Sequence, residues 1–190
     1  MTDDDGATGP RRAAPGHPHG DLSYGTPGAT SPGALIWPRT PSGFRRFERT
    51  VPIGRGEHVW TAAARAVARW EVKTRSGFTV TADDGADAAV RRGGRYTVTA
   101  GLGPLAVREP VEVVAVVGTP DRCGFAYGTR HGHPVSGEEA FVVHRDHEGR
   151  VFLTLRSLTR AAPAGPWRLA FPLLLLAQRR VRGRYLRALP

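Results

Sequence analysis

The chain is poor in cysteine, methionine and lysine, with one of each among its 190 residues. Because Cys123 stands alone, no disulfide can form within the chain. The cysteine and the histidines also lack the spacing of a zinc site, and we expect neither a metal nor a cofactor. Apolar residues make up 40% of the sequence, which is enough for a core that folds without cross-links.

Long apolar runs are missing as well. The longest extends from Leu169 to Ala177 and contains Pro172, whereas a helix that spans a bilayer needs about 20 apolar residues. The first residues, Met-Thr-Asp-Asp-Asp, are acidic and carry no apolar stretch, so they do not resemble a secretory signal. We therefore expect a soluble, cytoplasmic protein.

Acidic residues are absent after Glu148. The net charge of the chain is +10, and residues 150–190 supply +9 of it through nine arginines and no acid. Arginine accounts for 26 of the 27 basic residues, and Lys73 is the exception. Codon usage in a GC-rich genome produces such an arginine bias, but it does not account for the missing acids at the C-terminal end.

Residues 1–21 are rich in Gly, Pro and charge and contain almost no large apolar side chain, so we expect a disordered tail there. Residues 22–190 are expected to form the folded domain. Its regular elements follow from alternating and helical spacing of apolar residues. They are a strand over 44–53, a helix over 57–70, six strands over 78–82, 96–102, 110–118, 122–128, 140–144 and 151–158, and a long helix over 165–189.

This order predicts an α+β fold of the START-like, helix-grip type, in which a curved antiparallel sheet wraps around a long C-terminal helix and leaves a cavity. An ordinary α+β sandwich with a filled core has the same element order. The last helix is predicted to have an apolar face toward the sheet and arginines around it. The apolar face comprises Leu174, Ala177, Val181, Tyr185 and Ala188, and the arginines are Arg179, Arg180, Arg182 and Arg187.

The densest polar motif lies between residues 124 and 141. A hairpin there brings Tyr127, His133 and one of Glu138 and Glu139 near each other, at the mouth of any pocket. A histidine paired with a carboxylate can act as a general acid and base. We favour the alternative, in which His133 and Glu138 hold the hairpin by hydrogen bonds and a salt bridge, because no nucleophile or set of oxyanion donors is evident. A metal site that includes His131 matches no known ligand spacing.

Several short motifs occur in a familiar order. They are Leu22-Ser23-Tyr24, Gly28-Ala29-Thr30, Ile53-Gly54-x-Gly56, Gly124-Phe125-x-Tyr127-Gly128-Thr129, Gly132-His133-Pro134 and Gly137-Glu138-Glu139-x-Phe141. Over about residues 22–189 the chain resembles the uncharacterised family known as domain of unknown function nineteen-ninety. The resemblance implies START-like architecture, and it brings no established activity or catalytic residue.

Three functions are compatible with these features. The first is a binding module for a small, largely apolar molecule, with the cavity lined by Phe78, Tyr96, Val98, Phe125, Tyr127, Phe141 and Phe152. The second is an enzyme that uses Tyr127, His133, Glu138 and Glu139 for proton transfer in the same cavity. The third is weak contact with an anionic surface through Arg179, Arg180, Arg182 and Arg187. We do not expect nucleic-acid binding, because no binding motif is present.

Overall fold

The structure is a computed structural model that describes residues 20–189, with the exceptions of residues 39 and 102. Residues 1–19, which make up most of the tail expected to be disordered, lie outside the described residues. The two last residues of that tail are described, and Asp21 is ion-paired with Arg130 at 2.7 Å. The chain is therefore anchored to the domain from Asp21 onward.

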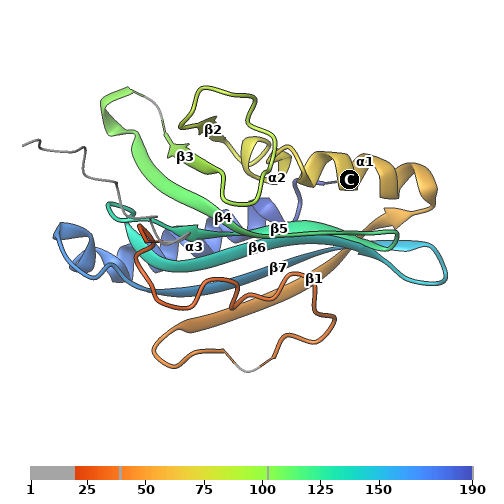
Figure 1. The fold of residues 1–190 in the computed structure, drawn as a ribbon, viewed down its shortest axis with the longest axis horizontal. Coiled ribbons are helices and arrows are strands. Elements are labelled where there is room, and N and C mark those ends of the chain that lie inside the picture. Colours follow the sequence, from red (N-terminus) through yellow and green to blue (C-terminus); the bar gives the residue numbers. More distant parts are fainter. Residues whose placement is uncertain (1–19, 39, 102, 190) are drawn as a thin grey trace, which may run out of the picture.

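A seven-stranded antiparallel sheet forms the centre of the molecule, in the order β1-β7-β6-β5-β4-β3-β2 (Figure 1). Strands β2 to β7 follow one another as neighbours, and β1 closes the arrangement beside β7. The strands are β1 (Arg45–Arg55), β2 (Phe78–Ala82), β3 (Arg95–Ala100), β4 (Val107–Thr119), β5 (Arg122–Thr129), β6 (Val135–Arg145) and β7 (Arg150–Ala161). The predicted α+β helix-grip class, with its strand, helix, six strands and terminal helix, is confirmed.

Among the strands, β6 departs furthest from the predicted boundaries. The sequence predicts a strand over 140–144, because Gly137 and its neighbours have the composition of a turn. In the structure this stretch pairs with β7, where Val135 lies opposite Ala161 and Glu138 opposite Leu158. The neighbouring strand thus extends β6 into residues whose own preference is weak.

The helices are α1 (Glu57–Val67), α2 (Glu71–Thr74) and α3 (Phe171–Tyr185), with single 3-10 turns η1 (Gly103–Leu105) and η2 (Pro166–Arg168). The helix predicted over 165–189 is divided because Pro172 has no N–H to donate, so α3 begins with this proline in its first turn. Within the described part of the chain, no helix has both the length and the apolarity that a bilayer crossing requires.

The helix predicted over 57–70 ends at Val67, and Trp70 adopts a left-handed backbone with φ of 61°. A left-handed conformation is costly for a bulky residue, so the surrounding packing must hold it in place. The indole of Trp70 packs against Phe125, Tyr96 and Tyr127, with ring centroids 4.5, 5.0 and 5.4 Å away. Burial of this large ring accounts for the break between α1 and α2.

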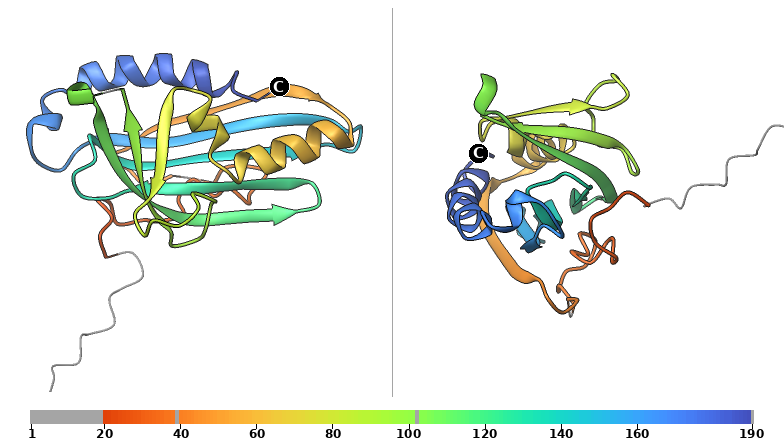
Figure 2. Two further views of the ribbon diagram at one scale, coloured as in Figure 1. Left: turned by 90° about the horizontal axis from the view of Figure 1, so that it is seen from above. Right: turned by 90° about the vertical axis from the view of Figure 1, so that its left-hand side faces the viewer.

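The two faces of the sheet are covered by different parts of the chain (Figure 2). We call the face beneath α1 and α3 the inner face, and the main hydrophobic core lies there. Trp60, Ala63 and Val67 of α1 pack in this core with apolar side chains of β3 to β7. The opposite, outer face carries the segment that precedes β1.

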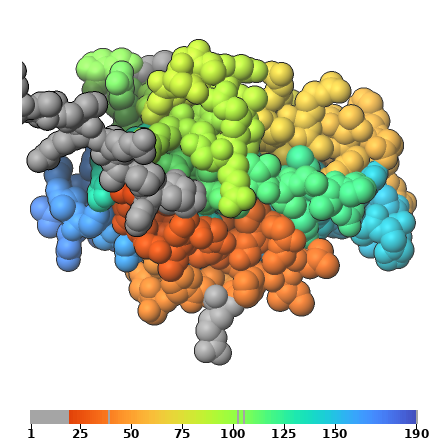
Figure 3. Space-filling model, viewed as in Figure 1, coloured from red at the N-terminus to blue at the C-terminus, as the bar shows by residue number. Residues whose placement is uncertain are grey.

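The described residues of this segment, 20–38 and 40–44, lie across the outer face (Figure 3). Trp37 is buried in it, and Arg156 of β7 holds it from below. The guanidinium of Arg156, which is 2% exposed, donates to the carbonyl oxygens of Ser31 at 2.6 Å and Leu35 at 3.1 Å. The segment is therefore an integral part of the fold, although it contains no regular element.

Candidate functional site

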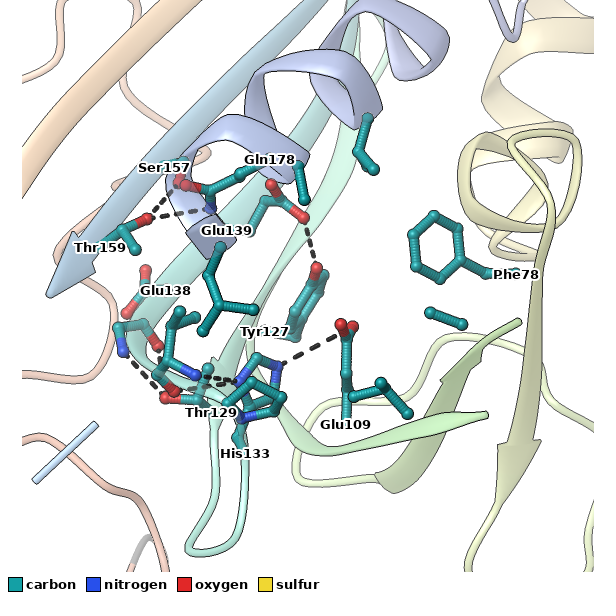
Figure 4. A pocket seen from close by; sticks show the side chains of 18 of the residues that line it. Phe78, Glu109, Tyr127, Thr129, His133, Glu138, Glu139, Ser157, Thr159 and Gln178 are labelled. Carbon is teal, nitrogen blue, oxygen red and sulfur yellow. Dashed lines mark hydrogen bonds and ion pairs between the residues drawn. The ribbon is translucent and has the colours of Figure 1, made fainter. Parts of the chain in front are cut away.

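A pocket of about 230 Å³ lies between the inner face of the sheet and α3 (Figure 4). Leu174, Ala177 and Val181 form its helical wall. On the sheet side, Tyr127 of β5 is the cross-strand partner of Glu139 of β6, which in turn lies opposite Ser157 of β7. Because side chains opposite one another in a sheet point to the same face, these three meet in the pocket.

A buried ionic network occupies the middle of the pocket. The ammonium of Lys73, from α2, lies 3.0 Å from Oε2 of Glu139 and donates to the Tyr185 hydroxyl at 2.7 Å. The hydroxyl of Tyr127 donates to the same Glu139 oxygen. Burial alone would lower the pKa of Lys73, but the charge of Glu139 and the neighbouring tyrosines hold it well above its ordinary value. Lys73 is thus a fixed cation.

Aromatic rings surround that cation. The Lys73 Nζ atom lies 4.7 Å from the centroid of the Tyr185 ring and 5.0 Å from those of Phe78 and Tyr127. Ring faces attract a cation, and the attraction is stronger where water is excluded. Burial and the charge of Glu139 raise the pKa of Tyr127 well above its ordinary value, so this hydroxyl remains protonated.

A second polar pair, His133 and Glu109, lies beside the network. Nε2 of His133 is 3.9 Å from a Glu109 oxygen, which is too long for a direct hydrogen bond. Nδ1 of His133 lies 3.0 Å from the carbonyl oxygen and 3.1 Å from the backbone nitrogen of Val135. Burial, together with the nearby charge of Lys73, lowers the pKa of His133 to about 3. Burial raises the pKa of Glu109 against the attraction of Lys73.

The neutral state of His133 makes stability depend on pH. Because an unfolded histidine titrates near 6.5, the unfolded chain binds more protons at this position than the folded protein does between about pH 6.5 and pH 3. The contribution of His133 is complete above that window and is lost as the pH falls through it. We expect wild type to lose up to about 1.4 kcal/mol per pH unit relative to His133→Gln.

Urea unfolding of both proteins at intervals from pH 7.5 to pH 5 measures this difference. The pKa of the half-buried His144 is also lowered by burial, but His144 is present in both proteins and cancels. Parallel pH profiles for the two proteins would show that His133 is protonated normally in the folded state.

Two acceptor oxygens in the pocket are suited to a ligand. The contacts of Lys73 and Tyr127 both fall on Oε2 of Glu139 and leave Oε1 as a further acceptor in the pocket. The Gln178 amide donates to Thr159 at 3.1 Å, but its oxygen is buried without a partner in the described part of the chain. A buried acceptor without a donor is unfavourable, so the Gln178 oxygen is suited to a ligand that carries a donor, and Oε1 of Glu139 offers a second acceptor in the same pocket.

The structure separates the adjacent residues Glu138 and Glu139. Glu138 lines the pocket together with Tyr127, His133 and Glu139, but its carboxylate is bound by the N-terminal segment on the other face of the sheet. The Tyr24 hydroxyl and the Gly28 N–H donate to one Glu138 oxygen at 2.8 Å, and Thr30 donates to the other through its N–H at 2.9 Å and its hydroxyl. Successive side chains of a strand point to opposite faces, which places Glu138 on the outer face.

Only some of the residues expected to line a cavity do so. Phe78 and Tyr127 border the pocket, whereas Tyr96, Val98, Phe125 and Phe141 are buried in the core and are not among its lining residues. Phe152 belongs to neither group. It is half-buried and stacks on His144, with ring centroids 5.3 Å apart. It alternates with the core residues Val151 and Leu153, and therefore lies on the outer face.

The arginines of α3 are not equivalent. Arg179, Arg180 and Arg187 are exposed, as the helical pattern predicts. Arg182 is half-buried, contrary to the prediction of an exposed position. It donates to the Ser157 hydroxyl at 3.0 Å and lies 4.2 Å from the centroid of the Phe47 ring. Ser157 of β7 and Phe47 of β1 both point toward α3 at this position, and both contact the guanidinium.

The pocket residues that sequence reasoning does not identify include Lys73, Glu109, Gln178 and Tyr185. Tyr185 is placed only on the apolar face of the last helix, and Glu109 precedes the strand predicted over 110–118. Lys73 carries a signal in the composition, because it is the only lysine among 27 basic residues. Within residues 20–189, no group of three or more His, Cys, Asp or Glu side chains is placed to hold a metal ion.

Comparison with known proteins identifies relatives in sequence. The family model described as Domain of unknown function (DUF1990) matches residues 23–188. The UPF0548 protein of Deinococcus radiodurans is 34% identical over 160 residues, which cover 80% of this chain and 79% of that protein. Residues 23–188 include the pocket, most of the N-terminal segment and α3.

Solved structures share the fold at low sequence identity. The hypothetical protein jhp0584 of Helicobacter pylori superposes with a TM-score of 0.58 at 11% identity, covering 82% of this chain and 93% of that chain. Ara h 8.0201 gives a TM-score of 0.50 at 12% identity, covering 77% of this chain and 95% of that chain. At such identities these structures support the helix-grip fold alone.

Proposed function

Since the chain belongs to the Domain of unknown function (DUF1990) family, whose description supplies no activity, we propose a function from the pocket itself. The protein binds a small, largely apolar molecule that carries one neutral hydrogen-bond donor, in the pocket between the sheet and α3. The observation that carries this proposal is the Gln178 oxygen, which is buried in a mostly apolar cavity without a partner among the described residues, with Oε1 of Glu139 as a second acceptor in the same cavity.

The size of the cavity limits the ligand. A volume of about 230 Å³ exceeds the cavity of roughly 150 Å³ that holds benzene, but lies below the roughly 300–1,000 Å³ of pockets for drug-sized molecules. A molecule with one or two small rings, or a chain of medium length, matches this size.

The charges of the pocket favour a neutral ligand. Lys73 and Glu139 neutralise each other at 3.0 Å. A charged group on the ligand would therefore be buried without a counter-charge of its own. Such a charge pays a large desolvation penalty. A hydroxyl or a ring N–H donates to the acceptor oxygens of the pocket without that penalty.

Acid-base catalysis by Tyr127, His133 and Glu139 is less well supported. An efficient proton-transfer group has a pKa near the working pH. The pKa of His133 is lowered to about 3 and that of Tyr127 is raised well above its ordinary value, so neither exchanges protons readily at neutral pH. Glu138, the fourth candidate, is engaged on the outer face.

Calorimetric titration and thermal shift with matched probes test the proposal. We compare indole with indene and indole-2-carboxylate, and 1-octanol with octane and octanoate. The member of each set with a neutral donor is expected to bind about tenfold more tightly than its hydrocarbon or carboxylate counterpart. Equal affinities within both sets would contradict the assignment of a donor.

A blocking variant shows whether binding occurs in this pocket. Ala177 lines the pocket and is exposed to solvent, so it lies at the mouth. Ala177→Phe is expected to weaken probe binding at least tenfold. Ala62→Phe, at an exposed position of α1, is the matched control and should bind as wild type does. Unchanged binding by Ala177→Phe would place the ligand elsewhere.

A further inference from the structure

The N-terminal part of α3 and the turn before it expose three leucines. Leu169 is 87%, Leu173 70% and Leu176 55% exposed. Spacings of four and three residues place them on one side, which we call the leucine stripe. Leu174 and Val181, on the opposite side of the helix, line the pocket. The leucine stripe is therefore used neither by the pocket nor by the core.

Basic residues continue the same side of the helix. Arg180 and Arg187 follow Leu173 by seven and fourteen residues, so they lie in line with it, and both are exposed. Arg179 is an exposed neighbour. The sequence has no acidic residue between 149 and 190, so nothing in this region of the chain neutralises these charges.

We propose that the leucine stripe and the arginines that follow it dock α3 on an anionic lipid surface. Leucines exposed beside arginines are the two features by which a helix lies in a membrane interface, with its apolar side chains among the acyl chains and its cations at the headgroups. Each arginine near an anionic leaflet strengthens binding about fivefold. The pocket can be empty or filled in this docked state, so docking does not rest on the proposed ligand.

The charges favour a membrane over a second copy of the chain. A two-fold dimer across this face would bring the same patch of each subunit together. Arg180 and Arg187 would then face the arginines of the other subunit without an acidic partner on α3 of either. Like charges at an interface oppose association, whereas an anionic leaflet attracts them.

Co-sedimentation of the full-length protein with vesicles tests the proposal. We compare vesicles of phosphatidylcholine alone with vesicles of phosphatidylcholine and phosphatidylglycerol at three to one, in 50 and 300 mM NaCl. The wild type is expected to bind the mixed vesicles at least tenfold more tightly, and to lose most of this preference at high salt.

Variants separate the apolar from the ionic contribution. Leu169→Ser/Leu173→Ser/Leu176→Ser is expected to weaken binding to mixed vesicles roughly tenfold or more, and Arg180→Gln/Arg187→Gln about fivefold for each arginine. The matched control is Leu35→Ser/Ile36→Ser, which removes two residues that are 80% and 86% exposed on the N-terminal segment. It should bind as wild type does.

Three results would overturn the proposal. One is equal sedimentation of the wild type with both kinds of vesicle, and another is wild-type binding by the leucine-stripe variant. The third is a dimer in light scattering that this variant converts to monomer, which would assign the stripe to a second copy. Because the same variants can be titrated with indole, a failure of docking is distinguishable from a failure of pocket binding.

Discussion

Replacement of Lys73 by methionine is expected to lower the free energy of unfolding by about 3–5 kcal/mol and Tm by about 6–20 °C. Lys73 is 3% and Glu139 7% exposed, so the substitution leaves a buried carboxylate without its cation. An unpaired buried charge is far more costly than the loss of an ion pair at the surface. Urea and thermal unfolding at pH 7.5 measure the change.

Two further variants identify the cause. Lys73→Met/Glu139→Gln removes both charges and is expected to recover at least half of the lost stability. Arg75→Met, two residues away, breaks the Arg75–Glu71 ion pair at 2.6 Å, whose side chains are 45% and 31% exposed. That change should be at most about 1 kcal/mol. Equal effects of Lys73→Met and Arg75→Met would show that the pocket is hydrated and its charges screened.

Substitution of Glu138 by glutamine is expected to detach the N-terminal segment from the sheet. A glutamine amide presents donors where the carboxylate accepts from Tyr24, Gly28 and Thr30. Hydrogen bonds to a charged group contribute about 1.5–3 kcal/mol each, so we expect a loss of about 3 kcal/mol or more in stability. Limited proteolysis should then cut within residues 22–44 before the rest of the domain.

The neighbouring glutamate is the matched control for this experiment. Glu139→Gln alters the pocket on the inner face, and residues 22–44 should remain protected from protease. Cleavage at equal rates in the two variants would contradict the assignment of Glu138 to the N-terminal segment and of Glu139 to the pocket.

The close approach of Tyr24 to β5 gives a reason for one motif glycine. A Cβ atom at Gly128 would clash with the hydroxyl and ring of Tyr24. Glycine at this position therefore lets Tyr24 reach Glu138 across the sheet. Tyr24, Gly28 and Thr30, from two motifs near the N-terminus, thus meet Glu138 of a distant third motif on the outer face.

Sequence patterns predict the elements well where the pattern is local. The strand over 78–82 agrees with β2 at both ends, because it is flanked by turn residues. Boundaries fail where tertiary packing decides them, as at β6, which β7 extends, and at Trp70, whose buried ring ends α1. Neither the length over which two strands pair nor the packing of one indole is encoded in the spacing of nearby residues.

The candidate site was only partly predictable for the same reason. The hairpin motif contains Tyr127, His133 and Glu139, and alternation alone separates Glu139 from Glu138 once the strand is known to begin before them. Lys73 and Tyr185 reach the pocket from two helices 112 residues apart, and only the fold brings them together. The isolated lysine in an arginine-rich chain marks the position, but the sequence does not show that it is buried.

Arginine is a poor substitute at that position. Lysine offers a compact ammonium that contacts Glu139 and Tyr185 at once, within a cage of rings. The planar guanidinium is larger and donates in a fixed fork, so it does not fit the same space. This difference explains why position 73 departs from the arginine usage of the rest of the chain.

Native mass spectrometry tests the central claim most directly, on wild type, Ala177→Phe and Ala62→Phe purified without denaturant from the source cells. If the pocket is the binding site, wild type and Ala62→Phe carry the same small neutral molecule with a hydroxyl or N–H group, and Ala177→Phe carries none. Wild type without a bound molecule, or the same molecule on Ala177→Phe, would contradict the assignment of the pocket between the sheet and α3 as the ligand site.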